Sequence, residues 1–137
     1  MMVGLIIAAH GGIAAEMLRS AASIMGSLPQ ARAFAIEPGA DIEAIHTQLQ
    51  DAVAEVNPEG DGVIIMTDMF GGTPANISNR FLKNPKVEII NGVNLPMVLK
   101  FCGSRNSMPV KTLADFLLRY GKKSIINTRE ILGGMEG

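Results

Sequence analysis

The sequence predicts one α/β domain, with an open, mainly parallel sheet of strand order 2-1-3-4 and helices on both faces. Short apolar runs alternate along the chain with segments of helical periodicity, which is the pattern of βαβ units. Residues 3–10 and 62–68 are apolar almost throughout, as expected for central strands covered on both faces. The 137 residues contain no repeat, low-complexity tract or linker, so we expect a single domain over residues 1–137.

The first half of the chain is predicted to contain two strands, each followed by a helix. Residues 3–10 form the first strand. Residues 13–25 follow as an amphipathic helix, which Gly26 ends because glycine readily takes a left-handed conformation. Residues 32–38 are a weaker strand. Residues 41–56 are a helix whose first residue, an aspartate, caps its free backbone N–H groups.

The second half is predicted to begin with the buried strand 62–68. Residues 73–82 then form a short helix with threonine at its cap and proline in its first turn. Residues 86–92 are the fourth strand. A loop and a short helix are expected over 93–103, and a longer helix over 109–121.

Composition excludes several classes of function. Lys and Arg number 12 and Asp and Glu 13, and no basic block is present, so we expect no nucleic-acid partner. The single cysteine, Cys102, belongs to no zinc-type cluster, so we expect no metal, no disulfide and a reducing environment. No apolar stretch approaches the ~20 residues of a membrane span, and the N-terminus lacks a signal-peptide pattern. The protein is therefore expected in the cytoplasm, without a cofactor.

Polar residues follow two of the predicted strands and introduce the candidate site. His10 ends the first strand and precedes two glycines, while Asp68 ends the third strand and precedes Met-Phe-Gly-Gly. In an open α/β sheet, ligands collect at the carboxyl ends of the strands, at the point where the order of building reverses. Strands one and three are neighbours in the order 2-1-3-4. We therefore expect His10 and Asp68 to face each other.

This pair predicts a histidine that is phosphorylated during the reaction. A carboxylate that accepts a hydrogen bond from one imidazole nitrogen fixes the tautomer and makes the other nitrogen a better nucleophile. Residues 71–76, Gly-Gly-Thr-Pro-Ala-Asn, place a turn and a helix start nearby, where backbone N–H groups attract phosphate. The bare glycines would let a partner protein bring its own phosphoryl group into line.

Simpler interpretations remain open for the same residues. Asp68 could cap the turn that follows it, and the glycine pair could serve close packing of helix on sheet. The second histidine, His46, lies in a predicted helix among polar residues and is expected at the surface. A non-catalytic nucleotide- or flavin-binding module is a further alternative, although neither a GxGxxG nor a GxxxxGK[ST] motif is present.

Three segments carry a resemblance to a known family. "AAHGG" after the first strand, "TDMFGGTPAN" after the third and "NGVNLPM" after the fourth resemble the loop motifs of the enzyme IIA domain of the mannose family of the bacterial sugar phosphotransferase system. The resemblance covers essentially the whole chain. It implies a mannose-type IIA domain that accepts a phosphoryl group on His10 from the carrier protein HPr and passes it to a histidine of enzyme IIB. The phosphocarrier subunit of a dihydroxyacetone kinase is an alternative in the same fold.

The resemblance also implies roles for individual residues. His10 would be the phosphoryl acceptor and Asp68 its hydrogen-bond partner. The phosphoryl group would be bound by Thr67, Gly71, Gly72 and Thr73. The rim that meets partner proteins would include Gly11, Phe70, Asn94, Leu95 and Pro96. Ala9 departs from the threonine that familiar members often carry, so the Thr67 hydroxyl could replace that missing group.

The resemblance finally implies an assembly. Members of the family are dimers that exchange an antiparallel last strand, which would give a role to residues 124–132, a segment that pattern alone does not assign. Enzyme IIB is expected to be a separate chain, because no IIB domain follows in the sequence. The system could serve sugar uptake, with peripheral association to a membrane permease, or regulation.

Overall fold

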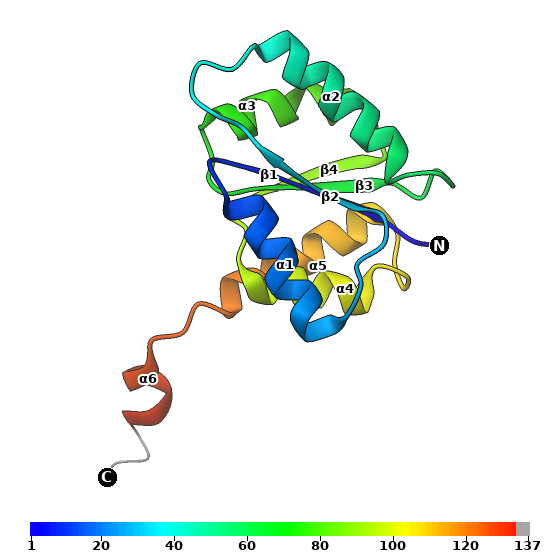
Figure 1. The fold of residues 1–137 in the computed structure, drawn as a ribbon. Coiled ribbons are helices and arrows are strands. Elements are labelled where there is room, and N and C mark those ends of the chain that lie inside the picture. The colour runs from blue at the N-terminus through cyan, green and yellow to red at the C-terminus, as the bar shows by residue number, and fades with distance from the viewer. Residues whose placement is uncertain (134–137) are drawn as a thin grey trace.

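Four strands form one open sheet in the order β2-β1-β3-β4, and every neighbouring pair is parallel (Figure 1). The structure is a computed structural model, and it describes residues 1–133. The strands are β1 (Gly4–Ala9), β2 (Ala31–Ala35), β3 (Val63–Thr67) and β4 (Val87–Asn91). The predicted strand order and fold class are confirmed.

Helices cover both faces of the sheet, as Figure 1 shows. One layer contains α1 (Ile13–Met25), α4 (Leu95–Ser104) and α5 (Val110–Lys123), and the other α2 (Ile42–Glu55), α3 (Thr73–Ser78) and the 3₁₀ helix η1 (Asn79–Lys83). Successive side chains of a strand point to opposite faces. Leu5 and Ile7 of β1 accordingly belong to the apolar core under the first layer, while Ile6 and Ala8 belong to the core under the second. Burial on both faces explains the continuous apolar run of β1.

Local signals set several element boundaries. The side chain of Asp41 accepts hydrogen bonds from the backbone N–H groups of Glu43 and Ala44, so the predicted cap of α2 is confirmed. Gly26 ends α1 with φ of 90°, as expected. The cap of α3 is Gly72, however, and Thr73 is its first helical residue. The helix predicted over 73–82 also tightens into the 3₁₀ helix η1 after Ser78.

A buried arginine ties together the amino-terminal ends of β1 and β2, opposite the candidate site. Arg105, at the end of α4, donates hydrogen bonds to the carbonyl oxygens of Val3, Pro29 and Gln30 over 2.7–3.1 Å. Burial lowers the pKa of this guanidinium. The hydrogen bonds to these carbonyl oxygens satisfy the guanidinium N–H groups, as the burial of a charged group requires.

The C-terminal segment is helical, where an exchanged antiparallel strand was expected. Thr128–Leu132 form α6, whose cap Asn127 accepts a hydrogen bond from the backbone N–H of Arg129. Figure 1 places α6 away from the sheet, and Ile125 is 78% exposed. A strand needs a neighbour for its backbone hydrogen bonds, whereas a capped helical turn forms locally. The single chain therefore contains no exchanged strand among its described residues, and the homodimer stays a prediction.

Among residues 1–133, no helix has both the length and the apolar character that crossing a bilayer requires.

Candidate active site

His10 and Asp68 lie in contact at the carboxyl edge of the sheet. β1 and β3 pair in parallel with Ala8 opposite Thr67, so the residues that follow the two strands emerge side by side. Nδ1 of His10 is 2.7 Å from Oδ2 of Asp68. The backbone N–H of His10 donates to the same oxygen over 3.0 Å. The juxtaposition predicted from the strand order is confirmed.

The contact leaves one ring nitrogen available. A neutral imidazole has one N–H donor and one acceptor nitrogen. Because the carboxylate can only accept, we assign the proton to Nδ1, which leaves the lone pair on Nε2. The His10 side chain is 42% exposed, whereas that of Asp68 is 12% exposed. A partner can therefore reach the imidazole but not the carboxylate behind it.

The environment of Asp68 favours its ionised form. Burial raises the pKa of this carboxyl, but the hydrogen bonds from the His10 backbone and ring, with the attraction of the ring, outweigh burial and lower the pKa below its ordinary value. The other oxygen, Oδ1, is buried and has no hydrogen-bond partner among residues 1–133. Both hydrogen bonds to this carboxylate therefore come from His10, through Oδ2.

Glycines leave space around the ring. A Cβ atom at Gly72 would lie 3.0 Å from Cε1 of His10, which is closer than ordinary packing allows, and 3.6 Å from Nε2, which is an ordinary contact. Gly11 and Gly71 have φ of 54° and 88°, values that side chains disfavour. Among the predicted glycines, Gly72 is the one that approaches the ring closely, whereas no atom lies within 4 Å of a Cβ position at Gly11 or Gly71.

A cavity of about 400 Å³ opens beside His10 and Thr73. The rest of its wall comes from the loop after β2 and the start of α2: Ile36, Glu37, Pro38, Gly39, Ala40 and Ile42. The sequence analysis missed this loop. The strand order could have predicted this loop as part of the site, because β2 lies next to β1 and its carboxyl end reaches the same edge of the sheet.

Exposed apolar side chains follow His10 and Asp68 closely in the sequence. Met69 and Ile13 are exposed, and Phe70, predicted to belong to the partner rim, is 80% exposed but lines a separate cavity with residues of β4 and α5. Met69 lies near Gly72, since its Cγ is 3.6 Å from the position of a Cβ there. Exposed apolar residues that cluster beside a reactive group are typical of a protein-docking surface. Met69 and Ile13 were not predicted as site residues.

Thr67 and Asn94 are not brought to the cavity of His10. Thr67 is fully buried, and its hydroxyl donates to Oδ1 of Asn91 over 2.6 Å. Asn94 caps α4 by accepting from the backbone N–H of Met97, and its amide donates to the carbonyl of Gly121. Both side chains are thus occupied within the fold. This contact between Thr67 and Asn91 was not predicted from the sequence.

The two other predicted rim residues also lie outside the cavity. Leu95 and Pro96 form the first turn of α4 and line no part of the wall beside His10.

As for metals, the described residues contain no group of three or more His, Cys, Asp or Glu that could hold an ion.

Fold and site together define an open α/β protein with a carboxylate-paired histidine at the point where the strand order reverses. The chain belongs to the family described as the PTS system fructose IIA component, which it matches over residues 4–118. It is therefore an EIIA component of the mannose and fructose family of the sugar phosphotransferase system, and a phosphotransferase-type protein. Such proteins work with a phosphocarrier and a IIB partner. The resemblance found in the three loop motifs is confirmed.

Individual relatives agree with this assignment. The fructose-specific EIIA component of Bacillus subtilis is 27% identical over 90% of this chain and 84% of its own length. The mannose-specific EIIAB component of Escherichia coli K12 is 26% identical over 80% of this chain, which corresponds to 34% of that longer protein. The crystal structure of the PTS IIA protein associated with the fucose utilization operon of Streptococcus pneumoniae has a TM-score of 0.84 and 26% identity, covering 96% of this chain and 99% of that one.

Proposed function

We infer that His10 accepts a phosphoryl group through Nε2 from phosphorylated HPr and passes it to a histidine of a separate enzyme IIB, for sugar uptake or regulation. The observation that carries this proposal is the contact between Nδ1 of His10 and Oδ2 of Asp68. It leaves Nε2 as the unprotonated nitrogen, on a ring that is 42% exposed beside an open cavity.

The transfer needs no cofactor. The lone pair of Nε2 forms a bond to phosphorus, and the bond between phosphorus and the histidine nitrogen of HPr breaks with its electron pair returning to that nitrogen. The His10 ring becomes positively charged and keeps its Nδ1 proton. Asp68 stabilises that charge because its carboxylate is ionised and largely shielded from water. Transfer to enzyme IIB reverses the same step, with the IIB histidine as nucleophile.

The moving phosphoryl group carries negative charge on its oxygens. Thr73, which lines the cavity with His10, would donate its hydroxyl to these oxygens. Gly71 and Gly72 would let the group approach the backbone closely, since neither presents a side chain. We assign the phosphoryl-binding role to these three residues and exclude Thr67, whose hydroxyl already donates to Asn91.

Partner proteins would dock over the apolar rim. Phe70, Met69 and Ile13 supply exposed apolar surface, and Gly11 leaves the approach to the ring open. The same rim would serve HPr and enzyme IIB in turn, since both must bring a histidine to Nε2. A homodimer, and peripheral association with a membrane permease, belong to the same proposal and follow from the family resemblance.

Phosphorylation by purified components tests the proposal. The full-length protein is incubated with phosphoenolpyruvate, enzyme I and HPr, and its intact mass and phosphopeptides are measured under conditions that preserve phosphohistidine. We expect one phosphoryl group, on the peptide that contains His10 and not on the one that contains His46. His10→Gln should abolish the mass increase. Acid-labile phosphate that persists in a folded His10→Gln protein would contradict the assignment.

Enzyme IIB supplies the second arm of the experiment. Adding a IIB component of the mannose or fructose type to the isolated phosphoprotein should remove the phosphoryl group from His10 and place it on IIB. Phosphorylation of His10 without transfer to any such IIB would favour a role outside sugar uptake, including the dihydroxyacetone kinase alternative.

A further inference from the structure

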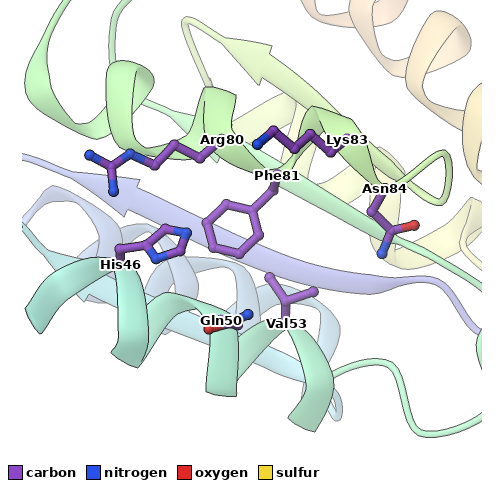
Figure 2. Close-up of a pocket in the computed structure, with 7 residues that line it drawn as sticks. All are labelled: His46, Gln50, Val53, Arg80, Phe81, Lys83 and Asn84. Carbon is purple, nitrogen blue, oxygen red and sulfur yellow. The ribbon is translucent and has the colours of Figure 1, made fainter. Parts of the chain in front are cut away.

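A second cavity, of about 640 Å³, lies between α2 and η1, on the face of the sheet covered by α2 and α3 (Figure 2). It shares no lining residue with the cavity beside His10. Its wall consists of His46, Gln50, Val53, Arg80, Phe81, Lys83 and Asn84. Neither the proposed transfer nor the apolar rim uses any of these residues.

Helix geometry explains why these side chains meet. In a 3₁₀ helix the side chains at positions i and i+3 are eclipsed, so Arg80 and Lys83 of η1 project on the same side. In α2, His46, Gln50 and Val53 are four and three residues apart and share one face. Figure 2 shows the two cations on one wall of the cavity and the α2 side chains on the other.

The cavity is electropositive. Two of its lining residues are permanent cations, and none is acidic. Arg80 pairs with Glu43 at one end, with Nη1 3.0 Å from Oε1. Within residues 1–133, Lys83 has no carboxylate at ion-pairing distance. An anion placed between the two cations would therefore gain charge-assisted hydrogen bonds without displacing an existing partner of Lys83.

The floor of the cavity is aromatic and apolar. The rings of His46 and Phe81 lie 5.2 Å apart between centroids, inclined by 33°. Val53, 8% exposed, closes the floor beneath them. Gln50 adds an amide group that both donates and accepts hydrogen bonds, while Oδ1 of Asn84 already accepts from the backbone N–H of Lys86, which leaves the Asn84 NH₂ group as a donor. A flat ring with polar edges fits this combination of stacking surface and amides.

We propose that this cavity binds a small organic phosphate that carries a planar ring, such as a nucleoside monophosphate. The phosphate lies between Arg80 and Lys83, and the ring covers Phe81 and His46. An acidic peptide suits the cavity less well, because its carboxylates leave the aromatic floor of Phe81 and His46 uncovered. The site lies apart from His10, so the proposal stands independently of the phosphoryl transfer described above.

Titration of the full-length protein with AMP, followed by NMR, tests the site. We expect AMP to shift the ring resonances of Phe81 and His46, with saturation and with weaker binding at higher salt. Adenosine lacks the phosphate group and inorganic phosphate lacks the ring. Titrated separately, each should therefore bind at least about tenfold more weakly than AMP.

Two variants and a matched control separate this site from general surface charge. Lys83→Gln should weaken AMP binding by about tenfold or more, because it removes a charged donor to phosphate. Lys86→Gln makes the same change at an exposed lysine outside the cavity and should leave the affinity unchanged. Phe81→Leu, checked for folding by thermal unfolding, should weaken AMP but not inorganic phosphate.

Three results would overturn the proposal. The first is the absence of saturable shifts at Phe81 and His46 with AMP. The second is an equal loss of affinity in Lys83→Gln and Lys86→Gln, which would indicate diffuse charge attraction. The third is displacement of AMP by a short acidic peptide at equal concentration, which would make the cavity a peptide-docking surface. None of these measurements involves HPr, so their failure leaves the phosphoryl-transfer proposal untouched.

Discussion

Asp68 holds His10 through one oxygen, with Oδ2 2.7 Å from the ring Nδ1 and 3.0 Å from the backbone nitrogen of the same residue. The ring is therefore oriented relative to its own backbone as well as to β3. A carboxylate that contacted only the ring would leave the imidazole free to move with its loop. The double contact keeps Nε2 directed at the space beside Gly72.

Asp68→Asn should slow phosphorylation of His10 by HPr. The substitution removes the negative charge that stabilises the positive ring. The new NH₂ group either faces His10 or takes the buried position of Oδ1, which has no hydrogen-bond partner. We expect a decrease of about 10²-fold, smaller than the ~10⁴-fold loss in a catalytic triad, because docking of HPr supplies alignment. Asp51→Asn, an exposed change in α2, is the control. A wild-type rate in a folded Asp68→Asn protein would show that Asp68 only caps a turn.

The same pair predicts acid sensitivity. The pKa of Asp68 is lowered in the folded protein, so the contact stabilises the fold above the unfolded-state pKa of about 3.9 and ceases to do so as the pH falls through the lower folded value. Thermal unfolding of wild type and Asp68→Asn should therefore differ most near neutral pH and converge below about pH 3.9. A difference between the two proteins that persists undiminished well below pH 3.9 would contradict an ionised, hydrogen-bonded Asp68.

Gly72→Ala should obstruct the nucleophile without unfolding the protein. The φ of −86° at Gly72 suits any residue, but the new methyl group would meet Cε1 of His10 at 3.0 Å. Because small displacements of reacting groups are costly, we expect phosphorylation to fall by about tenfold or more. Gly12→Ala adds the same group at φ of −90° where nothing lies within 4 Å, so it serves as the control. Equal rates in the two variants would refute the steric argument.

Thr67→Val distinguishes the structural role of Thr67 from the phosphoryl-binding role expected from the sequence. The valine keeps the shape but removes the hydroxyl that donates to Asn91 Oδ1. Denaturant unfolding should show a loss of about 1–3 kcal/mol in the free energy of unfolding. Phosphorylation should stay within a few-fold of wild type, as in the exposed control Thr112→Val. A folded Thr67→Val protein that is not phosphorylated would show that the Thr67 hydroxyl takes part in phosphoryl transfer.

The C-terminal segment should mediate dimer formation. Ile125, Ile126 and Ile131 are exposed in the single chain, and β4 is an edge strand with no neighbour beyond it among the described residues. Such surfaces favour pairing with a second chain. Light scattering should show a dimer for the full chain and a monomer after truncation at Lys123. A monomeric full-length protein at micromolar concentration would contradict a role of this segment in dimer formation.

The sequence alone was sufficient for the order of elements and for the central pair of the site. Strands β1 and β3 are buried on both faces, so their apolar runs are continuous and easily recognised. His10 and Asp68 follow these strands directly, and the rule that ligands gather at the carboxyl edge of a parallel sheet brings them together. Local signals of this kind also identified the Asp41 cap.

Tertiary structure alone decided where the other side chains point and which distant segments meet. Strand periodicity does not tell whether a hydroxyl at the end of β3 faces the cavity or Asn91, and Thr67 faces Asn91. The wall around His10 depends on the loop after β2, and the cationic cavity depends on α2 (Ile42–Glu55) lying beside η1 (Asn79–Lys83), which is distant in the sequence. The conformation of residues 124–132 depends on whether a neighbouring strand is present to pair with their backbone. In a single chain a capped helical turn forms, because a strand needs a neighbouring backbone for its hydrogen bonds.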